Sequence, residues 1–473
     1  MEGLPAQPPL SRPARLLLAA APALLGFSLA LRPIENWDIG FILRIGERVA
    51  RSGIPVTDPF SFPGIGKAWA LEQWLGPLAF WEAFRLGGVP GVIVFKALIC
   101  GAAMLLAFWA ARAASGSDLL ACFGALLCAA AGAARFNAQP NVITTLFVAL
   151  TALSLHARRG EWFLPLLFAL WVHVHPGYLS GLVLLFAWAV GALLDRRPNP
   201  LGVFAACAGA CVASLWLFHP LGLEPLWRVI AIFRSPASQS NIGEYAPLGF
   251  SYALSAPVLA LLAVAPVCWG FARLRGGALP PMAVAASWAA FALGELRVGR
   301  LLAEASVVLA PVFAQAVAQA APLVRVRLRP TLIASLALLA AAFAAAAHLA
   351  VPAERDLSWP SALYPRACYE WLDAHAPPRG FNDLWFGGSF IFHFDGRRLT
   401  FIDGRSFYSD DFFVSDYLPL RNAQPGWQQL AAKWQLDYFL LKPGRFRGLH
   451  AALQANGWRA AYLDPDCAVY LRR

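Results

Sequence analysis

Carboxylates are concentrated in the polar stretch that follows the first apolar run. Asp38, Glu47, Asp58 and Glu72 lie in this stretch, between positions 35 and 88, interleaved with arginines and tryptophans. A positioned carboxylate can take the proton from a hydroxyl group and so turn its oxygen into a nucleophile. Asp38 is the candidate for this role, although an aspartate is also a favourable cap for a helix that begins at the next residue. Both roles are compatible with the sequence.

The other carboxylates of this stretch have competing interpretations. Glu72 is a candidate second acidic group that contacts an acceptor or a metal, or else a solvated residue before the amphipathic stretch 74–84. Asp58 stands in Pro-Val-Thr-Asp-Pro-Phe-Ser, which favours a structural turn. Glu47 has helical spacing to neighbouring arginines and predicts ion pairs on a surface helix with Arg44, Arg48 and Arg51.

Arginines near the ends of apolar runs are candidate ligands for a phosphate group: Arg135, Arg297 and Arg300. The planar guanidinium binds phosphate oxygens through two parallel hydrogen bonds and stays charged at any relevant pH. The alternative is that these side chains extend to the membrane surface without binding a ligand. Glu304 lies one helical turn beyond Arg300 and is a candidate partner for it.

Four further polar residues near the ends of apolar runs are candidates for binding substrate: Asn137, His173, His175 and His219. His173 and His175 would project to different sides of a continuous helix, so a shared metal requires the helix to break before Pro176. Hydrogen bonding to substrate or to a loop is the favoured interpretation. We predict no metal ligand among these residues, and the sequence permits a divalent metal cofactor without requiring one.

The overall composition indicates a membrane protein. The chain has 473 residues, of which 59% are hydrophobic and 14% charged, and its mean hydropathy is +0.56. These values are too apolar for an ordinary soluble domain. The net charge of +11 comes mainly from arginine, and in a membrane protein such an excess usually reflects orientation. No basic run is interleaved with aromatic residues, so we expect no nucleic-acid partner.

Apolar runs of suitable length predict about eleven transmembrane helices. The first run follows two arginines, as in a signal peptide, but its length and the poor cleavage site after it favour an uncleaved span. The runs lie at 14–33, 89–111, 118–134, 141–157, 161–175, 178–194, 201–218, 252–271, 279–294, 300–321 and 331–351.

Arginines mark every second connection between these runs, which predicts a cytoplasmic N-terminus. They are Arg12 and Arg15, Arg112, Arg158 and Arg159, Arg196 and Arg197, Arg273 and Arg275, and Arg325, Arg327 and Arg329. An odd number of spans then places the C-terminal region outside the cytoplasm. The candidate site residues fall at this same outer face, as in an active site that opens outward.

Residues 353–473 are predicted to form a small soluble α/β domain after a transmembrane domain at 1–352. The expected strands lie at 390–394, 398–402, 438–441 and 468–471, and the expected helices at 427–434 and 448–456. Cys368 and Cys467 of this region either form a disulfide or remain two thiols. The other six cysteines lie in apolar segments without a Cys-x-x-Cys pair, so a zinc or redox site is not expected.

The first loop, 35–88, resembles the first extracytoplasmic loop of the GT-C superfamily of membrane glycosyltransferases, and more narrowly a bacterial branch of it. Gly46-Glu47 and the run from Pro55 to Phe62 agree with this pattern, as do Trp69, Glu72 and Trp74. The chain departs from the pattern where Asn36 replaces the first acidic residue, where Phe41-Ile42 replaces Trp-His, and where Gln73 is inserted between Glu72 and Trp74. Weaker matches elsewhere are Gln139-Pro140, Trp171-Val-His173-Val-His175, His219-Pro220, Asn382-Asp383, Gly387-Gly388 and Asp403-Gly-Arg405.

The resemblance implies a glycosyltransferase that uses a polyprenyl-phosphate sugar as donor. It implies that Asp38 is the general base and that the reaction takes place at the outer face of a bacterial inner membrane. The acceptor would be a glycan, a lipid or a protein. The departures at Asn36 and Phe41-Ile42 leave open a non-catalytic binding or assembly subunit for envelope polysaccharide. A transporter of lipid-linked sugars is disfavoured, because no internal repeat and no mid-span charges are evident.

Overall fold

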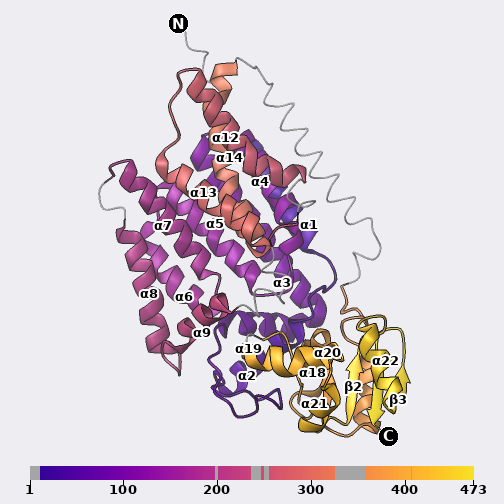
Figure 1. The fold of residues 1–473 in the computed structure, drawn as a ribbon. Coiled ribbons are helices and arrows are strands. Elements are labelled where there is room, and N and C mark those ends of the chain that lie inside the picture. Colours follow the sequence, from indigo (N-terminus) through magenta and orange to yellow (C-terminus); the bar gives the residue numbers. More distant parts are fainter. Residues whose placement is uncertain are drawn as a thin grey trace.

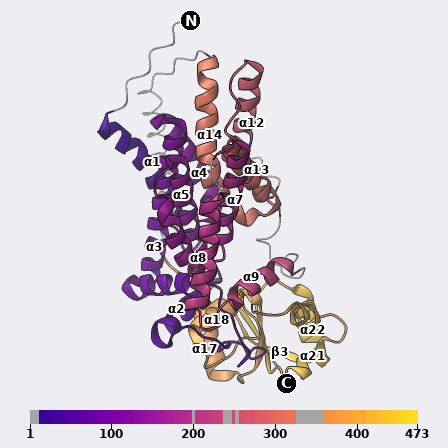
Figure 2. The same ribbon diagram turned by 90° about the vertical axis from the view of Figure 1, so that its left-hand side faces the viewer.

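The computed structural model describes residues 11–197, 201–235, 247–249, 255–324, 357–405 and 407–472. A bundle of long helices forms one end of the molecule and a compact C-terminal part lies at the other (Figure 1). The start of α1 (Arg12–Ala30) and the C-terminal part lie at opposite ends of the bundle in both ribbon views (Figure 2).

Helices are present at ten of the eleven predicted spans. The eleventh, 331–351, lies outside the described residues. Five of the helices are long and apolar enough to cross a membrane, and the chain is a polytopic helical membrane protein. The helices at the other predicted spans are α3 (Leu75–Ser115), α4 (Asp118–Gly132), α5 (Asn141–Ala157), α6 (Leu164–Val174), α7 (Tyr178–Leu194), α8 (Gly202–Phe218), α12 (Ala256–Leu274), α13 (Met282–Arg297) and α14 (Leu302–Val324).

Small residues allow the helices of the bundle to approach closely. Gly26 of α1 lies against Met104 of α3, and Gly101 of α3 lies against the backbone of Ala23. Close approach of this kind drives helix association in lipid, where burial of apolar area contributes little. Helix α3 is interrupted at Gly87 and Gly88, where the backbone is not helical.

Shorter elements surround the end of the bundle that faces the C-terminal part. They are α2 (Ile39–Ser52), α9 (Glu224–Arg234) and 3₁₀ turns at Ala133–Arg135 and Gly299–Leu301, whereas a further 3₁₀ turn, Glu161–Phe163, precedes α6 at the opposite end of the bundle. Helix α2 carries the expected ion pairs of Glu47 with Arg44 and Arg51. Glu47 is nevertheless buried, because one face of α2 packs against α3 and the C-terminal part. α2 is therefore a packed helix as well as an ion-paired one.

The C-terminal part contains a four-stranded sheet in the order β1-β2-β4-β3. β1 (Gly380–Asn382) is parallel to β2 (Tyr438–Leu441), and β4 (Ala468–Arg472) pairs antiparallel with both β2 and β3 (Trp458–Leu463). Its helices are α17 (Arg366–His375), α18 (Leu384–Phe394), α19 (Asp410–Phe412), α20 (Leu418–Arg421), α21 (Trp427–Lys433) and α22 (Arg447–Ala455), with a π-helical turn at Phe413–Tyr417. The boundary predicted at 352 and 353 lies outside the described residues.

Two strand predictions are wrong. The segment 390–394 is the end of α18, whose buried residues Phe386, Phe390, Ile391 and Phe394 follow helical spacing. A short apolar and aromatic run does not distinguish a strand from a buried helix, and only the Asp383 cap before it marks a helix start. The segment 398–402 forms a single bridge, between Thr400 and Ser61 of the first loop.

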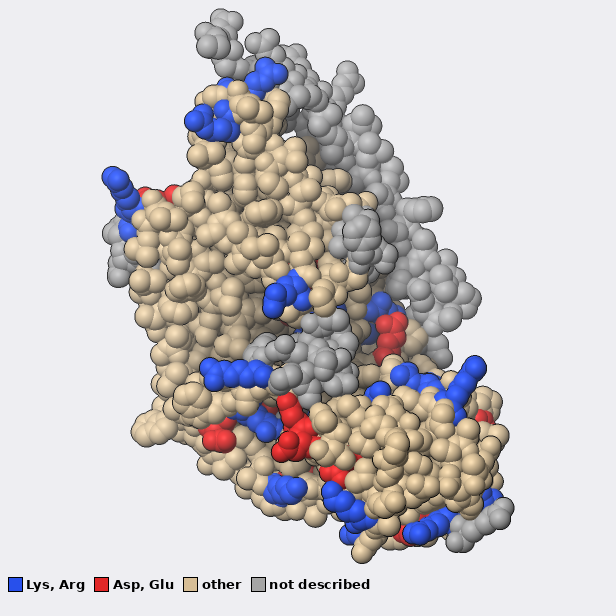
Figure 3. Space-filling view, in the orientation of Figure 1, with Lys and Arg blue, Asp and Glu red and all other residues tan. Residues whose placement is uncertain are grey.

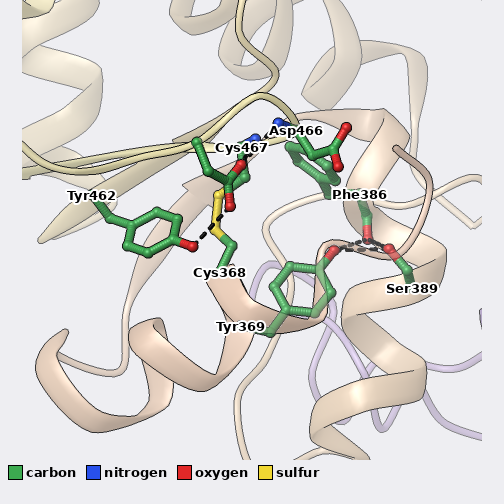
Figure 4. Close-up of a disulfide and its surroundings, with 8 residues drawn as sticks. Cys368, Tyr369, Phe386, Ser389, Tyr462, Asp466 and Cys467 are labelled. Atoms are coloured by element: carbon green, nitrogen blue, oxygen red, sulfur yellow. Dashed lines mark hydrogen bonds between the residues drawn. A yellow bond between two sulfur atoms is a disulfide. The ribbon is translucent and has the colours of Figure 1, made fainter. Parts of the chain in front are cut away.

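Cys368 and Cys467 form a disulfide with their Cα atoms 6.4 Å apart, within the usual range (Figure 4). The bond joins α17 to the turn between β3 and β4. Next to it, the Tyr369 hydroxyl lies 2.7 Å from Ser389 Oγ of α18. Asp464 accepts hydrogen bonds from the backbone of Cys467 and from the Tyr462 hydroxyl. The sheet, α17 and α18 are therefore held together in one unit.

Replacing both Cys368 and Cys467 by serine should lower the stability of the C-terminal part by about 2–5 kcal/mol, because the unfolded chain loses its cross-link. Thermal unfolding of the full-length protein in detergent, followed by tryptophan fluorescence, measures this effect. Cys268→Ser is the control, since Cys268 is a free cysteine of α12 and its replacement should leave the transition unchanged. An equal transition temperature for the double variant and the wild type would contradict the prediction.

Candidate functional site

A cavity of about 990 Å³ lies where the first loop, α9 and the C-terminal part meet. Its size is at the upper end of the usual range for ligand sites. Charged side chains gather along this junction in the space-filling view, whereas the visible surface of the bundle above it carries few (Figure 3). The charged residues that line the cavity are Glu35, Asp38, Arg228, Arg234, Arg300, Asp403, Arg405 and Asp410.

Asp38 stands at the start of α2 but does not cap it, because its side chain makes no hydrogen bond to the helix backbone. The capping interpretation is therefore wrong. Asp38 Oδ2 instead accepts a hydrogen bond of 3.1 Å from Gln139 Nε2. The Asp38 backbone N–H donates to Asn36 Oδ1 at 3.0 Å. Gln139 thus holds the carboxylate at the wall of the cavity, and Asn36 holds the backbone of the same residue.

Three glycines of the C-terminal part allow close packing of the backbone beside Asp38. A methyl group on Gly404 would collide with Asp38 Oδ1, and one on Gly388 would collide with the carbonyl oxygen of Trp37. A methyl group on Gly387 would collide with the backbone of Asp403. The turn at 403–405, the start of α18 and the segment 37–38 are therefore stacked at backbone distance, and none of these glycines can carry a side chain without displacement.

Arg405 joins the C-terminal part to the first loop inside the protein. Its guanidinium donates to both oxygens of Asp403, each at 2.7 Å, and to Asp58 Oδ1 at 2.6 Å. It also lies over the ring of Trp69, with 4.8 Å between its central carbon and the ring centre. Asp58 accepts hydrogen bonds from the backbone of Phe60, as expected for a structural turn. The turn interpretation is correct, but the pairing with Arg405 was not predicted.

The three predicted phosphate arginines occupy different environments. Arg300 lines the cavity, with Nη2 3.3 Å from His175 Nε2. Arg297 is exposed at the end of α13, and Arg135 is half-buried in a 3₁₀ turn; neither lines the cavity. α9 instead supplies Arg228 and Arg234, which were not predicted as site residues. The sequence does contain an indication of these two arginines, because the segment 224–234 is amphipathic. The segment was nevertheless assigned to a loop.

The histidines separate at the end of α6. The helix ends at Val174, before Pro176, and His175 is extended, so His175 reaches the cavity while His173 does not. His173 accepts a hydrogen bond from Trp74 Nε1 at 3.0 Å and lies 2.9 Å from Ser214 Oγ. The ring of His219 lies 3.2 Å from the carbonyl oxygen of Leu71. His173 and His219 therefore connect elements of the protein, whereas Asn137 and His175 line the cavity.

Glu72 lies outside the cavity lining, and its Oε1 is buried without a hydrogen-bond partner among the described residues. Burial raises the pKa of Glu72 from 4.5 to about 7. Glu72 is half-buried, with Oε1 shielded from solvent, so its carboxyl group is only partly solvated. Within the described ranges, no group of three His, Cys, Asp or Glu residues is placed to hold a metal ion.

No protein-family model and no curated protein matches the sequence. Solved structures do match the fold. An oligosaccharyltransferase from Archaeoglobus fulgidus is 14% identical, with a TM-score of 0.59 over 90% of this chain and 69% of its own. ArnT from Cupriavidus metallidurans is 14% identical, with a TM-score of 0.55 over 96% of this chain and 97% of its own.

A third structure, the arabinofuranosyltransferase AftD from Mycobacteria, is 17% identical with a TM-score of 0.52. The match covers 98% of this chain and 42% of AftD. All three are GT-C glycosyltransferases. The chain therefore has the GT-C fold, as its first loop implied.

Replacing Gly404 by alanine should displace the Asp38 carboxylate, because the added methyl group would occupy the position of Oδ1. We expect loss of any activity that depends on Asp38, by about a hundredfold for a displacement of about 1 Å. Gly448→Ala is the matched control in the same C-terminal part, since a methyl group there meets no atom. Crystal or cryo-EM structures of both variants check the displacement directly, and an unmoved carboxylate in Gly404→Ala would contradict the prediction.

The raised pKa of Glu72 predicts a pH-dependent stability. Because the folded state holds the proton more tightly than the unfolded chain, stability should fall as the pH rises from about 4.5 to about 7 and then level off. Glu72→Gln cannot ionise and should lose less stability than the wild type over this interval. Thermal unfolding at a series of pH values checks this, and parallel pH profiles for the two proteins would refute the assignment.

Proposed function

We propose that the protein is a membrane glycosyltransferase that moves a sugar from a polyprenyl-phosphate carrier to an extracytoplasmic acceptor. The observation that carries this proposal is that Asp38 and Arg300 line the same cavity in a chain with the GT-C fold. A candidate base and a candidate phosphate ligand are thus exposed to one space. That space lies at the end of an apolar bundle, where a lipid carrier can present its phosphate from the bilayer.

The proposed reaction is a single displacement at the anomeric carbon of the donor sugar. Asp38 takes the proton of the acceptor hydroxyl, whose oxygen forms the new bond to the anomeric carbon. The bond from that carbon to the phosphate oxygen breaks, and the polyprenyl phosphate leaves with the electron pair. The configuration at the anomeric carbon is therefore inverted. The acceptor is a glycan, a lipid or a protein.

The arginines of the cavity stabilise the phosphate as it departs. Arg300 reaches the space from the bundle, and Arg228 and Arg234 reach it from α9. Charge-assisted hydrogen bonds from guanidinium groups match the oxygens of a phosphate and strengthen as negative charge develops on them. Arg135 and Arg297 do not line the cavity, so this proposal assigns them no contact with the phosphate. Asn137 and His175 line the cavity and bind the substrate. His173 and His219 connect elements of the surrounding structure instead, and Glu72 does not line the cavity.

The proposed orientation places the N-terminus in the cytoplasm of a bacterium and the C-terminal part outside its inner membrane. The Cys368–Cys467 disulfide supports this orientation, because disulfides persist mainly in oxidising compartments. The arginine-marked connections support it as well, since Arg112 lies in the last turn of α3 and Arg158 directly follows α5, and both helices begin beside the cavity and so end away from it.

A second candidate function is a non-catalytic binding subunit for envelope polysaccharide. The observation that favours it is that Phe41 and Ile42, which replace the Trp-His of the related pattern, line the cavity themselves. In this version the cavity binds a lipid-linked glycan without cleaving it. The two functions differ in whether the donor is consumed.

Replacing Asp38 by asparagine should abolish transfer, by about a hundredfold or more, because an amide cannot take the proton. The wild type and the variant, full-length in lipid nanodiscs, are incubated with synthetic polyprenyl-phosphate hexoses and pentoses and an envelope glycan extract. Mass spectrometry measures the released polyprenyl phosphate. Glu370→Gln is the control, since Glu370 is an exposed residue of α17 that pairs with Arg366.

Full activity in Asp38→Asn would overturn the assignment of the base. Binding of the donors by the wild type without any release of polyprenyl phosphate would favour the non-catalytic subunit. Lipids that co-purify with the protein, identified by mass spectrometry, indicate which sugar donor to test first.

A further inference from the structure

Two amide side chains connect Asp38 to the segment before α5. Asn36 is only 8% exposed. Its Oδ1 accepts from the Asp38 backbone N–H at 3.0 Å, and its Nδ2 donates to the carbonyl oxygen of Ala138 at 3.4 Å. The residue after Ala138, Gln139, donates from Nε2 to Asp38 Oδ2 at 3.1 Å. The adjacent residues 138 and 139 thus bind residues 36 and 38 of the first loop.

Asn36 uses both ends of its amide, and an aspartate at this position could not. An ionised carboxylate accepts hydrogen bonds but donates none. An aspartate at position 36 would therefore place a negatively charged oxygen against the Ala138 carbonyl oxygen, in a buried position where an unpaired acceptor is costly. It would also add a second negative charge two residues from Asp38. The amide at position 36 fits its partners, whereas the acidic residue of the related pattern would not.

Gln139 bonds the side chain of Asp38, whereas Asn36 bonds its backbone. Its N–H fixes the position of one carboxylate oxygen, so rotation of the Asp38 side chain would break the hydrogen bond. The turn at Gly404 limits the space beside the other oxygen. Asn36, Gln139 and Gly404 come from three different segments of the chain, and together they restrict the carboxylate to one orientation at the cavity wall.

We propose that Asn36 and Gln139 are positioning residues for Asp38, and that in this chain the first acidic position of the loop must be an amide. This proposal rests on the proposed function, in which Asp38 is the base. The consequence is counter to the usual expectation: restoring the acidic residue by Asn36→Asp impairs the enzyme instead of improving it. Gln139 has a catalytic effect although it does not touch the reacting atoms.

The test uses Asn36→Asp and Gln139→Leu in the full-length protein, in the donor assay described above. Each variant should lower kcat about tenfold to a hundredfold, as expected when a catalytic group loses its orientation. The KM for the donor should stay within about twofold, because the arginines that bind the phosphate are unchanged. The control for the amide-to-acid change is Asn456→Asp, and the control for the loss of an amide is Gln428→Leu; both residues are exposed in the C-terminal part.

The outcomes separate this proposal from the proposed function. Inactive Asp38→Asn together with impaired Asn36→Asp and Gln139→Leu supports both. Inactive Asp38→Asn together with wild-type or higher kcat in Asn36→Asp and Gln139→Leu overturns the positioning role alone. Fully active Asp38→Asn overturns the role of Asp38 as the base and this proposal with it, whereas a wild type that releases no polyprenyl phosphate overturns the proposed function. A rise in KM at unchanged kcat would show that the amides bind substrate, which also overturns the positioning role. If Asn36→Asp does not fold, Gln139→Leu decides alone.

Discussion

The structure of the site depends on the buried ion pairs of Arg405. Asp403 and Asp58 hold the guanidinium between them, and the aromatic ring of Trp69 covers it. A charge in this position is tolerable only while its partners remain, because an unpaired buried charge costs several kcal/mol. The pairing therefore fixes the C-terminal part on the first loop in one arrangement. In that arrangement Gly404 reaches Asp38, and the C-terminal part forms one wall of the cavity.

Local signals in the sequence predicted the parts of this site that depend on local structure. Apolar runs of about twenty residues predicted the helices, because length and hydropathy suffice for that purpose. Pro-Val-Thr-Asp-Pro-Phe-Ser predicted the turn at Asp58, whose carboxylate accepts from the backbone two residues later. The resemblance of the first loop to the GT-C pattern drew attention to Asp38. The solved structures confirm the fold that this resemblance implied.

The parts of the site that the sequence did not predict depend mainly on contacts between distant segments. Arg405 and Asp58 are 347 positions apart, and no pattern near either residue indicates the other. His173 and His175 were assigned the same role, yet the helix end between them sends His175 to the cavity and His173 to Trp74 and Ser214. α9 was assigned to a loop because it is too short and too polar to be a span. The strand predicted at 390–394 failed because an aromatic run is buried equally well as a helix.

The same long-range pairing has a consequence for biosynthesis. The segment with Asp38 leaves the ribosome early, whereas Gly404 and Arg405 follow only after all the described helices of the bundle have been made. A partly synthesised chain in the membrane therefore has the carboxylate but not the wall that orients it. The site is thus completed as a late step of assembly, after the helices of the bundle have been made.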